Sequence, residues 1–239
     1  MSGTQCGCLP FIFMNIKEVI PISGYIEILP ELLEGASVTI QILLVSAVVT
    51  FFVAFIAGLG RVSRYAIVRG FTGVYVELFR GTSLLVQMFW IYYALPAFGI
   101  KLSAFVAGVL ALSLNYGAYG SEIVRGAIQA IPKGQTEATI ALNFTRWQRM
   151  RRVILPQALR IMLPGFGNTL IELLKGTSLV ALITLADLTY QGLIIRNADL
   201  SLTLEVFISL LIMYFLIALP LIILVRKLEK NASKGVAKV

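Results

Sequence analysis

The chain has 239 residues, of which 58% are hydrophobic and 13% are charged, with a mean hydropathy of +0.88. This composition excludes an ordinary soluble domain, and the length allows one membrane domain of five or six helices. The sequence contains no histidine, which is the commonest metal ligand and general base, and we expect no metal or cofactor site. The net charge is +8. The basic residues lie beside apolar runs, so membrane topology explains this charge better than nucleic-acid binding does.

The first residues show no secretory signal, because a basic segment is missing and the apolar run is short. The only two cysteines, Cys6 and Cys8, lie in this tail, and we interpret them as an incidental pair. A start of translation at Met14 is an alternative that the intact mass of the natural protein would test.

Five apolar segments follow an N-terminal region, 1–35, that is a tail and then an amphipathic interfacial helix over 15–35. Each segment approaches the ~20 residues that cross the hydrocarbon core. We therefore predict an all-α integral membrane fold with five transmembrane helices. A polar link over 187–200 precedes the fifth helix, and the chain re-enters the membrane over 71–80. The predicted spans are 36–60, 82–98, 103–119, a stretch within 161–185, and 202–225. The membrane domain is 36–230, and 231–239 is a tail.

Charge sets the predicted orientation. The segments 61–80 and 125–160 and the C-terminal end lie on one side and carry 16 of the 20 Lys and Arg residues. The positive-inside rule makes this side cytoplasmic. We therefore expect an N-terminus outside, a C-terminus inside, and the loop 132–156 in the cytoplasm.

That loop is the longest polar stretch in the middle of the chain, and loops of this length are usually functional or disordered. Its first half carries helix formers, and Asn143 follows at a position suited to a left-handed C-terminal cap. Thr145 and Gln148 have the spacing of a capping box for a second helix, which Pro156 should close. The pattern predicts two short helices with a sharp turn, a shape suited to docking.

A Glu-x-x-Arg/Lys-Gly motif occurs three times. The charged pairs are Glu77/Arg80, Glu122/Arg125 and Glu172/Lys175. Side chains three residues apart share a helix face, so each pair is expected to form an ion pair. The first and third copies extend to ELFRGTSLL and ELLKGTSLV, which suggests equivalent places in the fold. The alternative is that the pairs only neutralise helix ends. The order Lys-Gly-Thr-Ser does not match a P-loop, so we expect ATP to be bound by another chain.

The loop also resembles a known family. Its residues Glu137 to Thr139, Leu142, Asn143 and Ile154 to Pro156 resemble the EAA loop of permease subunits of bacterial binding-protein-dependent ABC importers. The family usually has Gly where this chain has Asn143. The resemblance covers roughly 29–230 and is greatest for the polar amino acid branch. The runs TEATIALN and FGNTLIELLKGTSLVALITLADLTYQ are most similar to ectoine/hydroxyectoine permease subunits.

This resemblance implies a type I ABC importer permease fold in the bacterial inner membrane, without enzymatic activity of its own. It implies an ABC ATPase dimer, a second permease subunit and an extracytoplasmic solute-binding protein as partners. The second permease could be an identical chain, but relatives in this branch often pair two different homologous chains, and we expect a different one here. The implied ATPase-coupling residues are Glu137, Ala138, Thr139, Leu142, Asn143, Phe144, Leu155 and Pro156. The implied substrate path is lined by Thr82, Ser83, Gln87, Asn115, Tyr116, Asn168, Glu172, Lys175, Thr177 and Ser178. Any of these polar groups could instead hold two helices together.

Other interpretations stay open at this point. The loop arginines could contact anionic lipid head groups or RNA, and we expect a lipid contact beside the ATPase contact. The aromatic residues over 89–93 suit an interfacial belt or, less simply, a cage for a cationic solute. A secondary transporter or channel that needs no ATPase is the alternative function. A membrane enzyme is disfavoured, since reactive side chains and paired carboxylates for a metal are lacking.

Overall fold

The computed structural model describes residues 22–233 of the chain, with side chains described for 28–230. Every regular element in this range is a helix, as the composition predicts. The elements are α2 (Ile22–Arg61), α3 (Ala66–Gly81), α4 (Leu84–Phe89), η1 (Trp90–Ala94), η2 (Leu95–Phe98), α5 (Ala104–Gln129), α6 (Lys133–Ala141), α7 (Arg146–Arg149), η3 (Met150–Ile154), α8 (Leu155–Thr177), η4 (Ser178–Ile183), α9 (Leu188–Ala198), η5 (Leu200–Leu202) and α10 (Thr203–Ser233).

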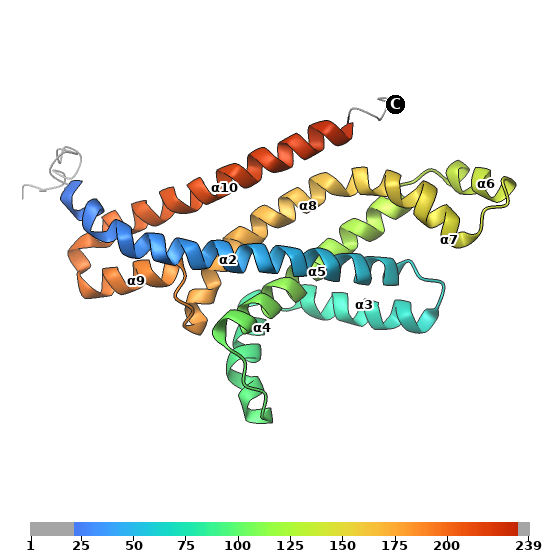
Figure 1. The fold of residues 1–239 in the computed structure, drawn as a ribbon. Helices are drawn as coiled ribbons and strands as arrows, with labels where there is room; N and C mark the ends of the chain where they lie inside the picture. Colours follow the sequence, from blue (N-terminus) through green and yellow to red (C-terminus); the bar gives the residue numbers. More distant parts are fainter. Residues whose placement is uncertain (1–21, 234–239) are drawn as a thin grey trace, which may run out of the picture.

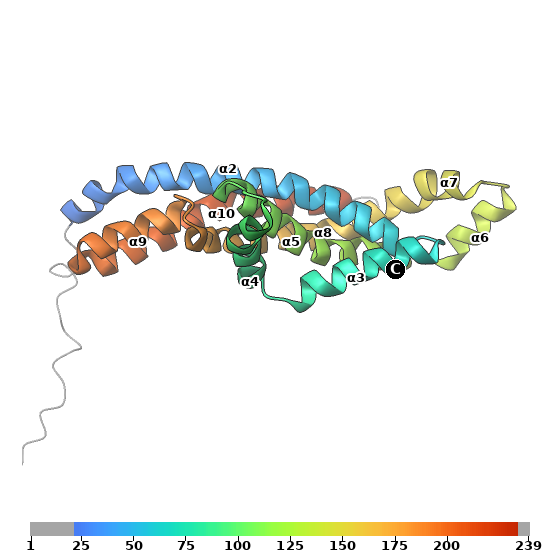
Figure 2. The ribbon, with the colours of Figure 1, turned by 90° about the horizontal axis from the view of Figure 1, so that it is seen from below.

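The helices form an elongated bundle. Helices α2, α8 and α10 run along its long axis, with α6 and α7 at one end and α9 at the other (Figures 1 and 2). We call these the hairpin end and the α9 end. Helix α5 lies between α2 and α8 and contacts both. The short arm made by α4, η1 and η2 stands out from the side of the bundle (Figure 1).

Helix α2 is continuous across the predicted boundary at residue 35. Ile28 and Leu32 are buried in a cluster with Leu188 of α9 and Val206 of α10. The part of the predicted interfacial helix that is described, 22–35, is therefore joined to the first span and packs against protein. The remainder of that prediction lies outside the described residues.

The chain breaks at the start of the second predicted span. Helix α3 turns back beside α2 and α5 from Ala66, earlier than the predicted re-entry at residue 71. The chain is then extended at Thr82 and Ser83, with ψ angles of 155° and 134°, before α4 begins. The predicted span over 82–98 corresponds only to the arm after this break.

Three described segments are long and apolar enough to cross a membrane: Ile28–Arg61, Arg146–Ile183 and Leu200–Lys230. The apolar arm Leu84–Phe98 is shorter, and α5 occupies the place of the predicted third span. The count of five transmembrane helices stays a prediction. The predicted polar link over 187–200 instead contains helix α9, because Asp187 caps that helix through the backbone N–H groups of Thr189 and Tyr190.

Candidate functional site

The turn of the hairpin is formed at Asn143. Its φ angle is 54°, so it adopts the predicted left-handed conformation. The N–H of Phe144 donates to the carbonyl of Thr139 at 3.0 Å, and the N–H of Asn143 donates to that of Ile140 at 2.9 Å. These two bonds are those of a Schellman motif, which Gly usually supplies and Asn can replace. The chain therefore reverses here without a glycine.

The second helix of the hairpin begins with the predicted capping box. The N–H of Gln148 donates to the Thr145 hydroxyl at 3.3 Å, and the N–H of Thr145 donates to the Gln148 side chain at 2.9 Å. The prediction that Pro156 closes this helix is wrong. The helix continues from Arg146 to Ile183, and a wide π-helical turn, η3, directly precedes Leu155 and Pro156. A wider turn relaxes the helical hydrogen-bonding pattern near proline, which has no N–H to donate.

The hairpin exposes an apolar tip. Leu142 is 67% exposed and Trp147 is 70% exposed, and Ile140 is also exposed. Of the predicted coupling residues, Glu137, Ala138, Asn143 and Pro156 are exposed as well, whereas Phe144 and Leu155 are half-buried. Thr139 is only 3% exposed, and its hydroxyl donates to the Thr136 carbonyl, so it supports the turn and cannot contact a partner directly.

Basic side chains surround this tip. Arg146, Arg151 and Arg152 are exposed, and Arg149 is half-buried with an Nε that has no hydrogen-bond partner. Trp147 and Ile140 were not among the predicted coupling residues. The capping box fixes where α7 starts, and an apolar Trp in such a charged helix was a signal that could have found Trp147.

A polar cluster closes the break between α3 and α4. The Gln87 side-chain amide donates to the carbonyl of Phe79 at 2.9 Å and to the hydroxyl of Thr82 at 2.6 Å. Asn115 of α5 donates to the same Phe79 carbonyl at 3.0 Å and to the Gln87 side-chain oxygen at 3.1 Å. Because a helix break frees carbonyls that must find donors inside a membrane, these side chains support the kink. Ser83, at the same break, is exposed.

A cavity of about 390 Å³ lies beside this break. Thr82 and Gln87 line it together with Leu78, Val86 and Trp90. The two polar residues that were predicted for the path thus border an open space, although their hydrogen bonds are made to each other, to the backbone and to Asn115. This part of the predicted path is brought together by the structure.

The predicted residues of α8 divide into two sets. Asn168, Glu172 and Lys175 are exposed on the helix surface. Thr177 is fully buried and donates to the Leu174 carbonyl, so it cannot line an open path in this conformation. Half-buried Ser178, the first residue of η4, donates to the Lys175 carbonyl at the end of α8. Tyr116 of α5 reaches across to α8, where its hydroxyl donates to the Glu172 carbonyl at 2.9 Å.

The charged motifs pair differently from the prediction. Among the described side chains, only Glu122 and Arg125 form the expected pair, at 2.6 Å. Arg61, at the end of α2, lies 3.1 Å from Glu122 and 3.8 Å from Glu77. The other two expected pairs, within the Glu77 and Glu172 copies, are absent from the described part of the chain. Arg80 instead lies over the Tyr119 ring, 5.3 Å from its centre.

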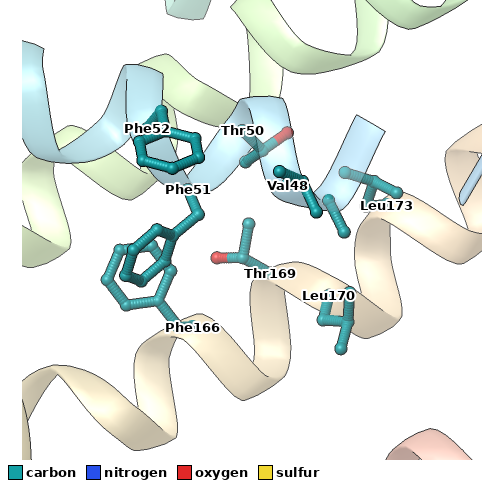
Figure 3. Close-up of a pocket in the computed structure, with 9 residues that line it drawn as sticks. Val48, Thr50, Phe51, Phe52, Phe166, Thr169, Leu170 and Leu173 are labelled. Atoms are coloured by element: carbon teal, nitrogen blue, oxygen red, sulfur yellow. The ribbon is translucent and has the colours of Figure 1, made fainter. Parts of the chain in front are cut away.

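A second cavity, of about 340 Å³, lies between α2 and α8 (Figure 3). The ring centres of Phe51 and Phe166, which form part of its wall, lie 5.6 Å apart. Figure 3 shows the Thr50 hydroxyl turned away from Thr169. None of the predicted path residues lines this cavity. Its apolar wall is unsuited to a polar solute.

Asp187 joins three helices at the α9 end, and the sequence analysis missed it. It is completely buried, it caps α9, and it accepts a hydrogen bond from Tyr214 of α10 at 3.4 Å. Gly35 of α2 lies directly against the Asp187 backbone, since an added Cβ there would come within 2.8 Å of its carbonyl oxygen. Burial raises the pKa of Asp187 to about 6, although the hydrogen bonds it accepts oppose this shift.

These features define a class of protein. Helices of membrane-spanning length, with a folded polar hairpin at one end and a break before α4, fit the permease part of a transport complex. Residues 50–234 match the family described as binding-protein-dependent transport system inner membrane component. The chain belongs to this family. It is a permease subunit of an amino-acid ABC importer, a multi-pass protein of the bacterial inner membrane, and not an enzyme.

Three similar proteins illustrate the match. The probable amino-acid ABC transporter permease protein y4tF of Sinorhizobium fredii (strain NBRC 101917 / NGR234) is 50% identical over 206 residues, which cover 84% of this chain and 86% of that protein. The L-cystine transport system permease protein TcyB of Bacillus subtilis (strain 168) is 39% identical over 209 residues, covering 87% and 89%. A solved structure described as an amino acid ABC transporter with histidines has a TM-score of 0.82 at 33% identity, covering 89% of this chain and 99% of that one.

Proposed function

We propose that the hairpin 132–156 is the lever through which a separate ATPase drives import of a small polar amino acid or a related solute. The observation that carries this proposal is the continuous helix from Arg146 to Ile183. It begins inside the hairpin and passes Glu172, Lys175 and Ser178 before it ends. A force applied to the hairpin is therefore transmitted along one continuous run of helix to the middle of the bundle.

The surface of the hairpin supports contact with a protein. Leu142, Ile140 and Trp147 are exposed apolar side chains of the hairpin, and Glu137 of the same hairpin is exposed as well. Exposed apolar groups rimmed by polar residues are typical of protein interaction sites. The turn at Asn143 is held by backbone hydrogen bonds, so the group is presented in a fixed shape. The arginines of α7 and η3 contact lipid head groups in this proposal.

Orientation follows the charges. Most of the Lys and Arg residues lie at the hairpin end, and the positive-inside rule supports a cytoplasmic position for this end, where ATP is available. The α9 end then faces outward, towards a solute-binding protein. The complex contains a second permease subunit, which we propose to be a different homologous chain.

The solute is a polar amino acid or ectoine. The names of y4tF and TcyB support an amino acid, and the latter specifies L-cystine for that protein. The similarity of TEATIALN and the α8 region to ectoine permeases supports ectoine or hydroxyectoine. The binding protein makes most of the selection in this proposal.

Reconstitution tests the proposal. The chain is placed in liposomes with a candidate ATPase, second permease and binding protein from the same organism, and uptake of labelled cystine, glutamine and ectoine is measured. We expect uptake of at least one solute only when ATP is on the hairpin side and the ATPase is present. Uptake at the same rate without the ATPase would contradict the proposal.

A further inference from the structure

The two long copies of the repeated motif are each followed by a change of helix geometry. After Gly81 the chain is extended at Thr82 and Ser83, and after Thr177 the helix tightens into the 3-10 helix η4. The segments that follow the two copies then meet. Met88 from the first and Ile183 from the second are fully buried in one apolar cluster. The repeat therefore marks two kinks whose downstream segments pack against each other.

Two tyrosines of the π-helical turn η1 fasten these segments together. The hydroxyls of Tyr92 and Thr184 lie 3.2 Å apart and share a hydrogen bond. The Tyr93 hydroxyl donates to the Leu182 carbonyl at 3.3 Å. The two rings pack edge to face, with centres 4.8 Å apart, so each ring restrains the other.

Thr184, which shares a hydrogen bond with Tyr92, has a strained backbone conformation. Thr184 has a φ angle of 63°, a conformation that β-branched residues rarely adopt. It is held there by the turn, in which its N–H donates to the Ala181 carbonyl and the N–H of Leu185 donates to Val180. Strain of this kind is concentrated at active sites, ligand clamps and switch regions. π-Helical turns are also frequent at functional sites.

This contact lies beyond α8, on the side away from the hairpin. In Figures 1 and 2 the arm and the segment that follows α8 lie side by side, between the middle of the bundle and α9. The contact hydrogen bonds are at the surface, whereas the apolar cluster below them is buried. Their loss therefore frees the two segments locally and leaves the core in place.

We propose that Tyr92 and Tyr93 form a clasp that holds the outer ends of the two kinked helices closed, and that the clasp opens in each transport cycle. This inference rests on the proposed function, because it assigns Tyr92 and Tyr93 as positioning residues of that transport path. They need not touch the solute. When the hairpin moves α8, the turn at Thr184 moves with it. Thr184 is then released from Tyr92, and the Leu182 carbonyl is released from Tyr93.

A bridging experiment in the full reconstituted complex tests the clasp. Cys6 and Cys8 are replaced by serine, and the pair Tyr92→Cys and Thr184→Cys is introduced. The cysteines are treated with a short bismaleimide, which can span the length of the lost tyrosine ring, or with N-ethylmaleimide, which modifies both but joins neither. Mass spectrometry measures the bridged fraction. Each single-cysteine variant receives the same treatments.

We expect the bridged protein to import at least tenfold more slowly than the N-ethylmaleimide sample, with single variants changed less than twofold by the bismaleimide. Unchanged uptake by protein that is bridged would overturn the clasp, as would two reactive cysteines that cannot be bridged. The variant Tyr92→Phe/Tyr93→Phe keeps both rings, and we expect it to hydrolyse at least threefold more ATP per solute imported. A ratio equal to that of the parent would also overturn the clasp. If the cysteine-free parent itself shows no ATP-driven uptake, the proposed function fails instead.

Discussion

Replacing Asn115 by leucine tests whether the polar cluster supports the broken second span. Asn115 is 5% exposed, and its side chain donates to the Phe79 carbonyl and to the Gln87 side chain. Leucine has the same branching and the same number of heavy atoms, so the change removes two hydrogen bonds and keeps a side chain of similar shape. The Phe79 carbonyl keeps its bond from Gln87, whereas the Gln87 oxygen loses the one partner that the described structure gives it.

The expected cost follows from these two losses. A hydrogen bond between membrane helices contributes about 0.6 kcal/mol on average and at most about 1.7 kcal/mol. An acceptor left buried without a partner costs about 1–3 kcal/mol. We therefore expect Asn115→Leu to lower the free energy of unfolding by about 1–3 kcal/mol. Gln87→Leu on the same background should cost about 1 kcal/mol less than it does alone, because the orphaned oxygen is then removed.

The assay is reversible unfolding in mixed micelles, followed by circular dichroism. Ser113→Ala is the matched control, since Ser113 is buried on the same helix and donates one long bond of 3.3 Å to the Ser46 carbonyl. We expect it to cost less than about 1 kcal/mol. If Asn115→Leu changes stability by less than the control does, and its effect adds to that of Gln87→Leu without coupling, the cluster does not support the break.

Three further predictions concern the turn, the α9 end and the charge network. Asn143→Gly should keep or raise the hydrogen-exchange protection of the hairpin amides. Asn143→Val should lower this protection by about 1–2 kcal/mol, because a β-branched residue is strained at the φ angle of 54° found at this position. Equal protection in both variants would contradict this. The pKa of Asp187 is raised from 3.8 to about 6, so the folded protein favours the protonated carboxyl. The free energy of unfolding should therefore fall by about 3 kcal/mol at most as the pH rises from 3.8 to about 6. Asp187→Asn should remove this slope, and a persisting slope would refute the assignment. In double-mutant cycles with Arg61→Met, the coupling energy to Glu122 should exceed about 1 kcal/mol. The coupling energy to Glu77 should stay below about 0.5 kcal/mol, because the Glu77 side chain is 73% exposed and lies 3.8 Å from Arg61. A larger coupling to Glu77 than to Glu122 would contradict this pairing of Arg61.

Local rules predicted the hairpin well. The left-handed turn at Asn143 and the capping box at Thr145 each depend on residues within five positions of one another, and both are present. Pro156 misled the same reasoning. A proline usually ends a helix, but the preceding turn is widened to a π-helix and the helix continues.

Interactions between distant residues could not be predicted in this way. The motif spacing suggested that Glu77 would pair with Arg80, yet Arg61 is closest to Glu77 and Arg80 lies over Tyr119. The partner is chosen by how α2, α3 and α5 pack, which the spacing within one helix does not contain. Asp187 was missed for a related reason, since a carboxylate in a short link gave no sign that three helices would enclose it.

The predicted path residues were a mixture of these cases. Thr82 and Gln87 do border a cavity. Their place could be predicted because a helix break needs polar side chains beside it, however the other helices pack. Thr177 is buried instead, since its position on α8 faces the core and the sequence did not establish which side of α8 faces the path.

The central claim is that an ATPase binds the hairpin and moves this membrane domain through it. Its most direct test is co-purification of the ATPase with Ala138→Asp, which places a charge on the exposed surface of α6. Asn197→Asp, on the exposed surface of α9, is the control. We predict that the ATPase is lost from Ala138→Asp by at least tenfold and retained by Asn197→Asp, with both proteins equally helical. Full retention by Ala138→Asp, or equal loss from both variants, would contradict the claim.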